Sequence, residues 1–361
     1  MGSRPAYCSR EALALALDRA LNVYSIEGLD RAIHSATDVI EQAFERRFYP
    51  YHGTWYFDVP ADDTSTSTPS WKLYTDPVDF ISVDSATVGG SAVSGIQLRP
   101  DNRTDRPASW LELDRAGATT FRDGTSGTPQ RRAAIVGTTG WWDEAKACGA
   151  LASTLAIGAD TADLVTAPAI GVAQVGVGHL LRVGSERLVV DDRLLVDTGE
   201  NLGADLVSQV SASIPTSITV GDGTDYAAGE MITVGGEVML IQRVLSNTLF
   251  VRRGYAGTPV ASHATGTDIY AYRRLLVTRG VAGTTAAEHA GADPVTRWVP
   301  PYAIEALAVA IAQETAVQEG AAYARTVGSD DNEREARASG LAAAWKRAKP
   351  YSRKGARTYA V

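Results

Sequence analysis

The chain has little cysteine and no long uninterrupted apolar segment. Two cysteines among 361 residues, Cys8 and Cys148, are too few to cross-link a chain of this size, so we expect free, partly buried thiols. No segment approaches the roughly 18 consecutive apolar residues of a membrane-spanning helix, and no membrane partner is expected. The apolar patch near the start follows Glu11 and ends at Asp18, which does not match a secretory signal. These absences indicate a protein that folds in a cytoplasm.

The sequence also lacks the short motifs of the common enzyme classes. We find no Gly-x-Ser-x-Gly or Ser-x-x-Lys motif in a strand–turn–helix context, no phosphate-binding loop and no dinucleotide fingerprint. His34, His52 and His179 are isolated in the sequence and are interpreted as structural. We therefore expect no enzymatic activity, no catalytic residue, no metal and no cofactor. The net charge of -8 argues against tight general binding of nucleic acid.

Acidic residues are missing from the C-terminal end, which is basic. From Trp345 to Val361 there are six basic residues and no acidic one. The tail 350–361 lacks helical periodicity and is either a solvated terminus or an arm that docks on an acidic surface of a neighbouring protein, with direct DNA binding ranked third. We favour the arm, whose docking residues would be Lys349, Tyr351, Arg353, Lys354, Arg357 and Tyr359.

Amphipathic patterns predict helices at both ends of the chain. Apolar residues recur at three- and four-residue steps from Leu29 to Phe48, and Ser9 is an N-cap candidate for a shorter helix before them. Pro300-Pro301 precedes an Ala-rich helix from Tyr302 to about Val327. A last helix is expected from near Ser329 to about Lys349. Residues 1–50 and 299–349 are thus predicted to be helical.

Period-two patterns replace the helical ones between these ends. Residues 51–150 contain short strand-like runs separated by Gly, Pro and polar clusters, which predicts antiparallel β-structure with long loops. Residues 151–298 are rich in Val, Gly and Thr and predict one or more small β modules. The predicted fold class is therefore α+β, in the order helix, β, β, helix.

Residues 151–298 contain an internal repeat. A phrase with an arginine, two glycines and a histidine ten residues after the arginine occurs twice, as Arg253, Gly254, Gly257 and His263, and as Arg279, Gly280, Gly283 and His289. Upstream, the segment Gly178 to Glu186 resembles Gly229 to Glu237, and both predict a strand, a tight turn and a strand. The simplest arrangement nests one module, at about 217–272, inside a similar one whose halves flank it. A tandem arrangement with one degenerate copy stays open.

The matched histidines, His263 and His289, are candidates for metal binding or acid–base chemistry. We find no Asp, Glu or Cys that recurs beside both at ligand spacing, and a duplicated catalytic site would normally degenerate in one copy. We therefore favour a structural role, in which each imidazole hydrogen-bonds to backbone in an irregular loop.

The order and phrasing of these segments resemble the head-to-tail connector, or adaptor, proteins of tailed bacteriophages, especially the larger kind from phages of high-GC actinobacterial hosts. The resemblance covers most of the chain, with no single diagnostic motif. The Arg-Gly-x-Ala-Gly-Thr…His phrase is similar to one common in phage virion proteins. The other matching segments are Glu45 to Pro50, Trp55 to Pro60, Trp71 to Val83 with Asp76-Pro77, Ser109 to Leu113, Gly137 to Trp142, and the helix after Val299-Pro300-Pro301.

The resemblance implies a helical bundle core formed by the N- and C-terminal helices, with the β regions added to it. It implies a virion structural protein of the neck, assembled in the host cytoplasm as a dodecameric ring. Its partners would be the portal and the next neck or tail-completion protein, and genome DNA would pass through the channel without sequence-specific binding. The C-terminal segment would dock on the portal through Arg353 and Lys354, so truncation after Pro350 would abolish attachment and leave the fold intact.

An alternative is a receptor- or glycan-binding tail protein whose β modules are adhesive. The region 151–298 has few aromatic residues, whereas sugar sites usually rely on exposed aromatic faces. They are chiefly Tyr226, Tyr255, Tyr270, Tyr272 and Trp298. A cell-wall hydrolase is a third class, which would need paired acids around a cleft.

Overall fold

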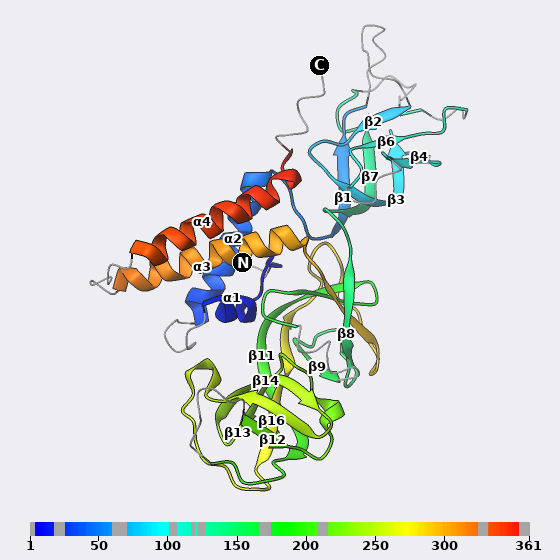
Figure 1. Ribbon diagram of the computed structural model, residues 1–361. Helices are drawn as coiled ribbons and strands as arrows, with labels where there is room; N and C mark the ends of the chain where they lie inside the picture. Colours follow the sequence, from blue (N-terminus) through cyan, green and yellow to red (C-terminus); the bar gives the residue numbers. More distant parts are fainter. Residues whose placement is uncertain are drawn as a thin grey trace. The chain divides into compact units, whose positions relative to one another are not determined.

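The chain forms two compact units in a computed structural model (Figure 1). The first unit comprises Met1–Ile40, Ala145–Val281 and Thr285–Lys349, and the second comprises Glu41–Glu144, Ala282–Thr284 and Pro350–Val361. The residues that the structure describes are 4–17, 26–59, 71–100, 107–116, 120–121, 128–165, 175–207, 216–323 and 331–353.

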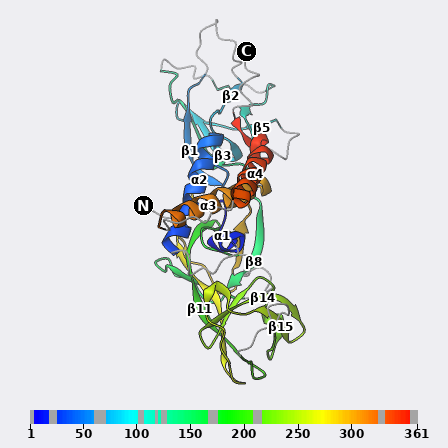
Figure 2. The same ribbon diagram turned by 60° about the vertical axis from the view of Figure 1, so that its left-hand side comes forward.

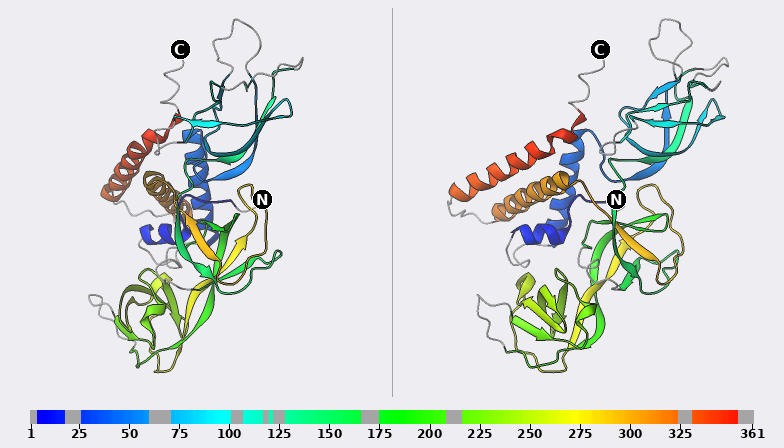
Figure 3. Two further views of the ribbon diagram at one scale, coloured as in Figure 1. Left: turned by 90° about the vertical axis from the view of Figure 1, so that its right-hand side faces the viewer. Right: turned by 45° about the vertical axis from the view of Figure 1, so that its right-hand side comes forward.

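Four α-helices occur among the described residues: α1 (Arg10–Leu17), α2 (Ile26–Phe44), α3 (Tyr302–Tyr323) and α4 (Asp331–Ala348). The Ser9 hydroxyl accepts a hydrogen bond from the Ala12 N–H at 3.1 Å and so caps α1. In the first unit α3 and α4 lie side by side (Figure 3), and α1 contacts α3. None of the helices in these described ranges is long and apolar enough to cross a membrane. The expected helix start near Ser329 lies outside the described residues.

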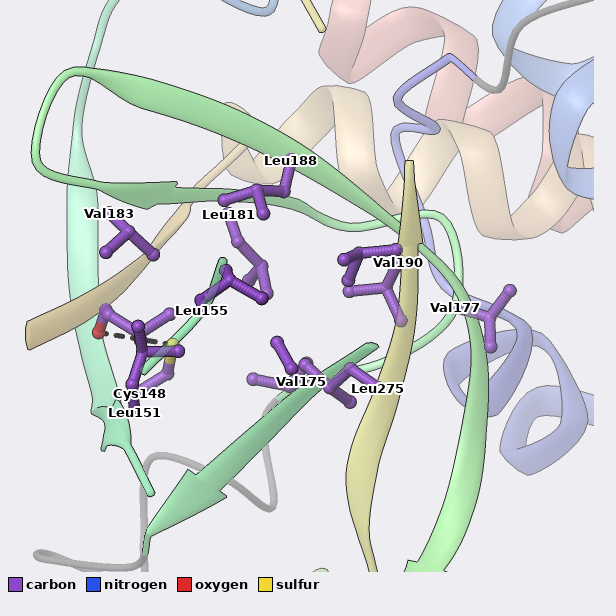
Figure 4. Close-up of a cluster of buried hydrophobic side chains, with 13 residues drawn as sticks. Cys148, Leu151, Leu155, Val175, Val177, Leu181, Val183, Leu188, Val190 and Leu275 are labelled. Carbon is purple, nitrogen blue, oxygen red and sulfur yellow. Dashed lines mark hydrogen bonds between the residues drawn. The ribbon is translucent and has the colours of Figure 1, made fainter. Parts of the chain in front are cut away.

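Six strands of the first unit pair in a closed antiparallel circuit, which we call the outer module. The order is β11, β10, β17, β8, β9, β16 and back to β11. Cys148, Leu181, Leu188 and Leu275 converge inside this circuit (Figure 4). The strands are β8 (Ala145–Leu151), β9 (Thr161–Val165), β10 (Leu180–Val183), β11 (Glu186–Asn201), β16 (Asp268–Thr278) and β17 (Pro294–Trp298).

The second half of β11 and the first half of β16 extend into another group of strands, which we call the inner module. Here β16 pairs with β13, β13 with β14, β14 with β15 and β15 with β12. Figure 2 shows β14 and β15 side by side. The inner module has its own buried cluster, which includes Ile232, Met239 and Leu249. The added strands are β12 (Thr216–Thr219), β13 (Met231–Val234), β14 (Glu237–Leu245) and β15 (Thr248–Arg252).

The two modules have the same strand connectivity. The hairpin β10–β11 of the outer module corresponds to the hairpin β13–β14 of the inner one. An isolated bridge joins Leu155 to His289 in the outer module, and its counterpart joins Leu206 to His263 in the inner module. Along the chain, the inner module begins within β11 and ends within β16. The chain therefore completes the inner module before it returns to the outer one.

The second unit contains two further antiparallel sheets around a core that includes Phe80, Leu111, Phe121 and Ile135. One sheet has the order β1 (Tyr51–Phe57), β7 (Ala133–Thr139), β3 (Phe80–Val88) and β4 (Ser91–Val93). The other has the order β2 (Lys72–Tyr74), β6 (Trp110–Glu112) and β5 (Gln97–Arg99).

The segment Ala282–Thr284 is also part of the second unit. The His52 N–H donates to the Ala282 carbonyl at 2.9 Å. Gly283 has a φ of +78°, and a Cβ at this position would lie 1.7 Å from the His52 carbonyl oxygen. Only glycine fits here, because both the backbone conformation and the space exclude a side chain.

The prediction of a helical bundle core is wrong. The described residues are mostly antiparallel β-sheet, with one ten-stranded sheet, and only four α-helices accompany it. Helix α1 is tied to strands and loops of the outer module: Arg10 pairs with Asp192 of β11 at 2.9 Å, and the Glu11 carboxylate accepts from the Val177 N–H at 2.9 Å. The expectation came from the resemblance, and the apolar stripes could not correct it, because a stripe shows that a helix buries one face but does not say against what.

Candidate functional site

The inner module contains a buried cluster of Glu237, Arg253 and His263. Arg253 donates from Nε to Glu237 Oε1 at 3.0 Å and from Nη2 to Oε2 at 2.6 Å. The Nε2 atom of His263 lies 2.9 Å from the same Oε2. The backbone N–H groups of Gly254 and Ala261 donate to this carboxylate at 2.9 and 3.1 Å. One carboxylate thus joins β14 to the irregular loop between β15 and β16.

The outer module contains the same cluster, made by Glu186, Arg279 and His289. Arg279 donates from Nε to Oε1 at 2.8 Å and from Nη2 to Oε2 at 2.6 Å. His289 Nε2 lies 2.8 Å from Oε2, and the N–H groups of Gly280 and Ala287 donate at 3.1 and 3.0 Å. The two copies therefore agree in every partner type.

The arginines also bind backbone carbonyls of the loops that they face. Arg253 donates to the Val207 and Ala261 carbonyls, and Arg279 donates to the Ala156 and Ala287 carbonyls. Each guanidinium therefore holds two loop segments as well as its carboxylate.

The repeated glycines shape the backbone around the clusters. Gly254 and Gly280 have φ values of 60° and 63°, in the left-handed region that glycine adopts at no cost. This conformation directs both N–H groups to the carboxylates. Gly257 and Gly283 also have positive φ, at 79° and 78°.

Burial by itself raises the pKa of Glu237 and of Glu186, because a low-dielectric environment disfavours the charged form. The hydrogen bonds from the arginine, the histidine and the backbone more than offset this, and the pKa of each carboxyl lies below its ordinary value. Each carboxylate is thus ionised, is matched by one arginine and has its acceptor sites occupied. This arrangement can hold a loop in place but offers no free acceptor for general base chemistry.

Sequence reasoning singled out the arginines, glycines and histidines but missed Glu186 and Glu237. It looked for an acid beside each histidine, whereas Glu237 lies 26 residues before His263 and Glu186 lies 103 before His289. The signal was present, because both upstream phrases end in Glu. An acid that recurs anywhere in both copies is a candidate partner, whatever its distance along the chain.

The predicted docking tail is only partly described. The Arg353 guanidinium pairs with Asp76 at 2.8 Å and also with Asp79, both of the second unit. The Tyr351 ring lies 4.9 Å from Trp141 and 6.0 Å from Phe48, centroid to centroid. Lys349 is the first residue of a short 3-10 turn, Lys349–Tyr351, which ends at Tyr351. Arg353 and Tyr351 thus contact their own chain, while Lys354, Arg357 and Tyr359 lie outside the described residues.

The two cysteines are both buried, and no disulfide joins them. The Cys148 thiol donates to the Val295 carbonyl at 3.3 Å inside the outer module (Figure 4). Burial raises the pKa of Cys8 and of Cys148 to about 12. Both thiols are therefore protonated and unreactive in the folded chain.

Within the described ranges, no group of three or more His, Cys, Asp or Glu side chains is arranged to hold a metal ion. No protein-family model matches the chain, and a search of curated protein sequences finds no match to it. The resemblance to phage connector proteins therefore stays a prediction.

Proposed function

We propose that the chain is a virion structural protein, a subunit of the head-to-tail connector ring that joins the portal to the tail and extends the DNA channel. The assignment of the portal and the tail-side protein as partners is based on the sequence resemblance. The assembly of identical subunits rests on a feature of the helices α3 and α4, and this observation carries the proposal.

A hollow of about 430 Å³ lies between α3 and α4. Its α3 side is lined by Ala306, Val309 and Ala310, and its α4 side by Leu341 and Ala344. These are small or apolar side chains, with Glu314 and Arg347 at the same hollow.

Helix α3 has apolar residues on its other side as well. Ile304, Leu307 and Ala308 are fully buried within the chain. A helix with apolar residues around its circumference needs cover on more than one side. A helix of a neighbouring copy would supply that cover, since small side chains let helices approach closely. Repetition of this heterologous contact closes a ring when the rotation between subunits divides a full turn.

The two Glu–Arg–His clusters support a structural role for the β modules. Each fixes an irregular loop through interactions that are satisfied inside the chain. Rigid loops suit a structural subunit of a symmetric assembly, because every copy must present the same surface to its neighbour.

The proposal is tested by the mass of the purified chain, alone and mixed with the portal of its phage, by light scattering and electron microscopy. We expect closed rings that form with, or are stabilised by, the portal. Val309→Glu is expected to abolish ring formation while the chain stays folded by circular dichroism. The matched control is Leu245→Glu, at a β-module residue with 60% exposure, which should assemble normally.

Rings of Val309→Glu with wild-type mass would show that the hollow is not the subunit interface. A monomer that ignores the portal would contradict the connector function as a whole.

A further inference from the structure

His179 of the outer module and Glu230 of the inner module occupy equivalent positions. Each follows a glycine with positive φ, Gly178 or Gly229, just before the hairpin. Each side chain accepts a hydrogen bond from the N–H of the residue three positions earlier. The Gly176 N–H donates to His179 Nδ1 at 2.9 Å, and the Ala227 N–H donates to Glu230 Oε2 at 3.3 Å. One module thus has a neutral side chain where the other has a carboxylate.

In the inner module this carboxylate neutralises a buried arginine. Arg273 Nε donates to Glu230 Oε1 at 2.7 Å, and Arg273 Nη2 donates to Oε2 at 3.3 Å. Glu230 is fully buried and Arg273 is 9% exposed. The charges of the pair are balanced, as buried charges require.

In the outer module the arginine that faces His179 has no such partner among the residues that the structure describes. Arg297 is 8% exposed, and its Nη1 lies 3.2 Å from His179 Nε2. Its Nε is buried and has no hydrogen-bond partner in the part of the chain that the structure describes. Among the described residues, no carboxylate oxygen lies within 4.0 Å of the Arg297 guanidinium, the distance that defines an ion pair. Glu305 interacts with Arg297 electrostatically, but only at longer range. Residues 166–174, which precede this site in the chain, contain no Asp or Glu.

The contact between Arg297 and His179 joins two donors. Burial lowers the pKa of His179, and the charges of Arg297 and Arg193 lower it further, so the ring is neutral. A neutral imidazole has one acceptor nitrogen, and Nδ1 uses it for the Gly176 N–H. Nε2 therefore carries a hydrogen that faces a guanidinium hydrogen. An acceptor that receives both hydrogens would remove this conflict.

A cavity of about 450 Å³ opens beside these two side chains. Arg297, His179 and Lys146 line it, together with Arg193, which already donates to the Tyr272 carbonyl. The acids at the cavity are Glu11, which accepts from the Val177 N–H, and Glu305. Lys146 is exposed and adds positive charge at the cavity.

We propose that this cavity binds a carboxylate ligand, whose oxygens accept hydrogen bonds from Arg297 and from His179 Nε2 and take the place that the Glu230 carboxylate has in the inner module. The planar guanidinium matches a carboxylate in shape, and such charge-assisted bonds are strong when buried. The carboxylate belongs either to a small molecule or to an acidic side chain of a neighbouring protein. This site is independent of the proposed connector function.

Binding is measured by calorimetry on the full-length chain at constant ionic strength, with succinate or free glutamate as the small-molecule probes and a short Glu-containing peptide as the polypeptide probe. Chloride is the reference anion. We expect saturable binding of at least one probe and a rise in the unfolding temperature with its concentration. Binding of succinate or glutamate assigns the site to small molecules, and binding of the peptide alone assigns it to an acidic side chain.

Two variants and one control make the test specific. Arg297→Gln is expected to weaken binding at least tenfold. His179→Glu supplies the carboxylate internally, so it should abolish binding and unfold at a higher temperature than wild type in chloride. Arg274→Gln, which changes an exposed arginine of β16, should bind as wild type does.

The proposal is overturned if no probe binds saturably, or if His179→Glu binds the probe as tightly as wild type. If Arg297→Gln fails to fold, His179→Glu and wild type still decide the question.

Discussion

Glu186 and Glu237 accept hydrogen bonds from the same set of donors in two separate modules: one arginine, one histidine and two backbone N–H groups. In each module the carboxylate joins the start of a strand to the loop that contains the paired arginine's glycine and the histidine. The two clusters are therefore matched internal replicates, and the loss of one can be compared with the loss of the other.

Substitution of either glutamate is expected to destabilise its module strongly. Glu237→Gln removes the charge that matches Arg253, whose side chain is 1% exposed, and leaves the guanidinium buried without a counter-ion. Loss of one partner of a buried ion pair costs about 3–5 kcal/mol. Glu186→Gln should cost a similar amount. The free energy of unfolding is measured by urea titration, with amide hydrogen exchange to show which module opens.

The control is the exposed ion pair of Arg274 and Asp163, at 2.6 Å on neighbouring strands. Asp163→Asn should leave the urea midpoint nearly unchanged, because exposed pairs contribute little. A loss as large as that of Glu237→Gln would mean that burial does not govern the effect.

The same clusters predict a loss of stability in acid. The pKa of Glu237 is lower in the folded chain than its ordinary value of 4.5, because hydrogen bonds from Arg253 and His263 outweigh the effect of burial. A lowered folded-state pKa gives stability that is present above the unfolded pKa and is lost as pH falls through the folded pKa. We expect the free-energy difference between wild type and Glu237→Gln to be constant near pH 7 and to shrink below about pH 4.5.

The unfolding free energies of wild type and Glu237→Gln are measured by urea titration at several pH values. Groups that titrate in both proteins contribute equally to both free energies, so their contribution cancels in the difference. Glu11 and Glu305 are such groups, since burial raises the pKa of each and their effect has the opposite sign. A difference that does not change between pH 7 and pH 3 would contradict the lowered pKa.

Alanine substitutions at two glycines of the second unit distinguish the cost of backbone strain from the cost of a steric clash. Gly90 has a φ of +85° and open space within 4 Å of the position that a Cβ would take, whereas Gly283 combines a φ of +78° with a Cβ position 1.7 Å from the His52 carbonyl oxygen. Gly90→Ala should cost about 1 kcal/mol from backbone conformation alone. Gly283→Ala should cost clearly more, because backbone atoms must move. Thermal unfolding followed by tryptophan fluorescence compares them, and equal losses would show that the segment Ala282–Thr284 adapts freely.

Truncation at two positions separates folding from docking at the C-terminus. Removal of everything after Pro350 also removes Tyr351 and Arg353, which pack on Trp141 and pair with Asp76 and Asp79. The expectation that this truncation leaves the fold intact therefore needs revision: we now expect it to lower the unfolding temperature of the second unit. Truncation after Arg353 keeps these contacts and should leave that temperature unchanged.

The candidate docking residues that remain are Lys354, Arg357 and Tyr359, and truncation after Arg353 removes all three. Portal binding of this truncated chain therefore tests the docking arm. Co-sedimentation with the portal is the measurement. Attachment as strong as that of the full-length chain would rule out the arm.

Local patterns coincide with two helix starts and with the repeated loops. Ser9 and Pro300-Pro301 stand just before α1 and α3, because capping and the missing proline N–H act within one helical turn. The two Arg-Gly phrases coincide with equivalent loops in the two modules, because the same short sequence makes the same turn with glycine at positive φ.

Contacts between distant segments were not predictable in this way. We expected the helices to pack mainly against one another, whereas α1 also binds the outer module through an ion pair with Asp192 and a hydrogen bond from the Val177 N–H. The tail residue Arg353 was assigned to a partner, while Asp76 and Asp79 of the same chain hold it. A sequence shows that a charge needs a counter-charge, but not which of many acids provides it.

The sequence by itself determined the repeated loops, the starts of α1 and α3 and the glycines of the tight turns, because steric and hydrogen-bonding rules of neighbouring residues suffice for these. Only the tertiary structure decided that Glu186 and Glu237 hold the paired arginines and histidines, and that Arg297 faces His179 where Arg273 faces Glu230. These outcomes depend on strand pairings between residues far apart in the chain, whose free energy comes from burial and not from any local preference.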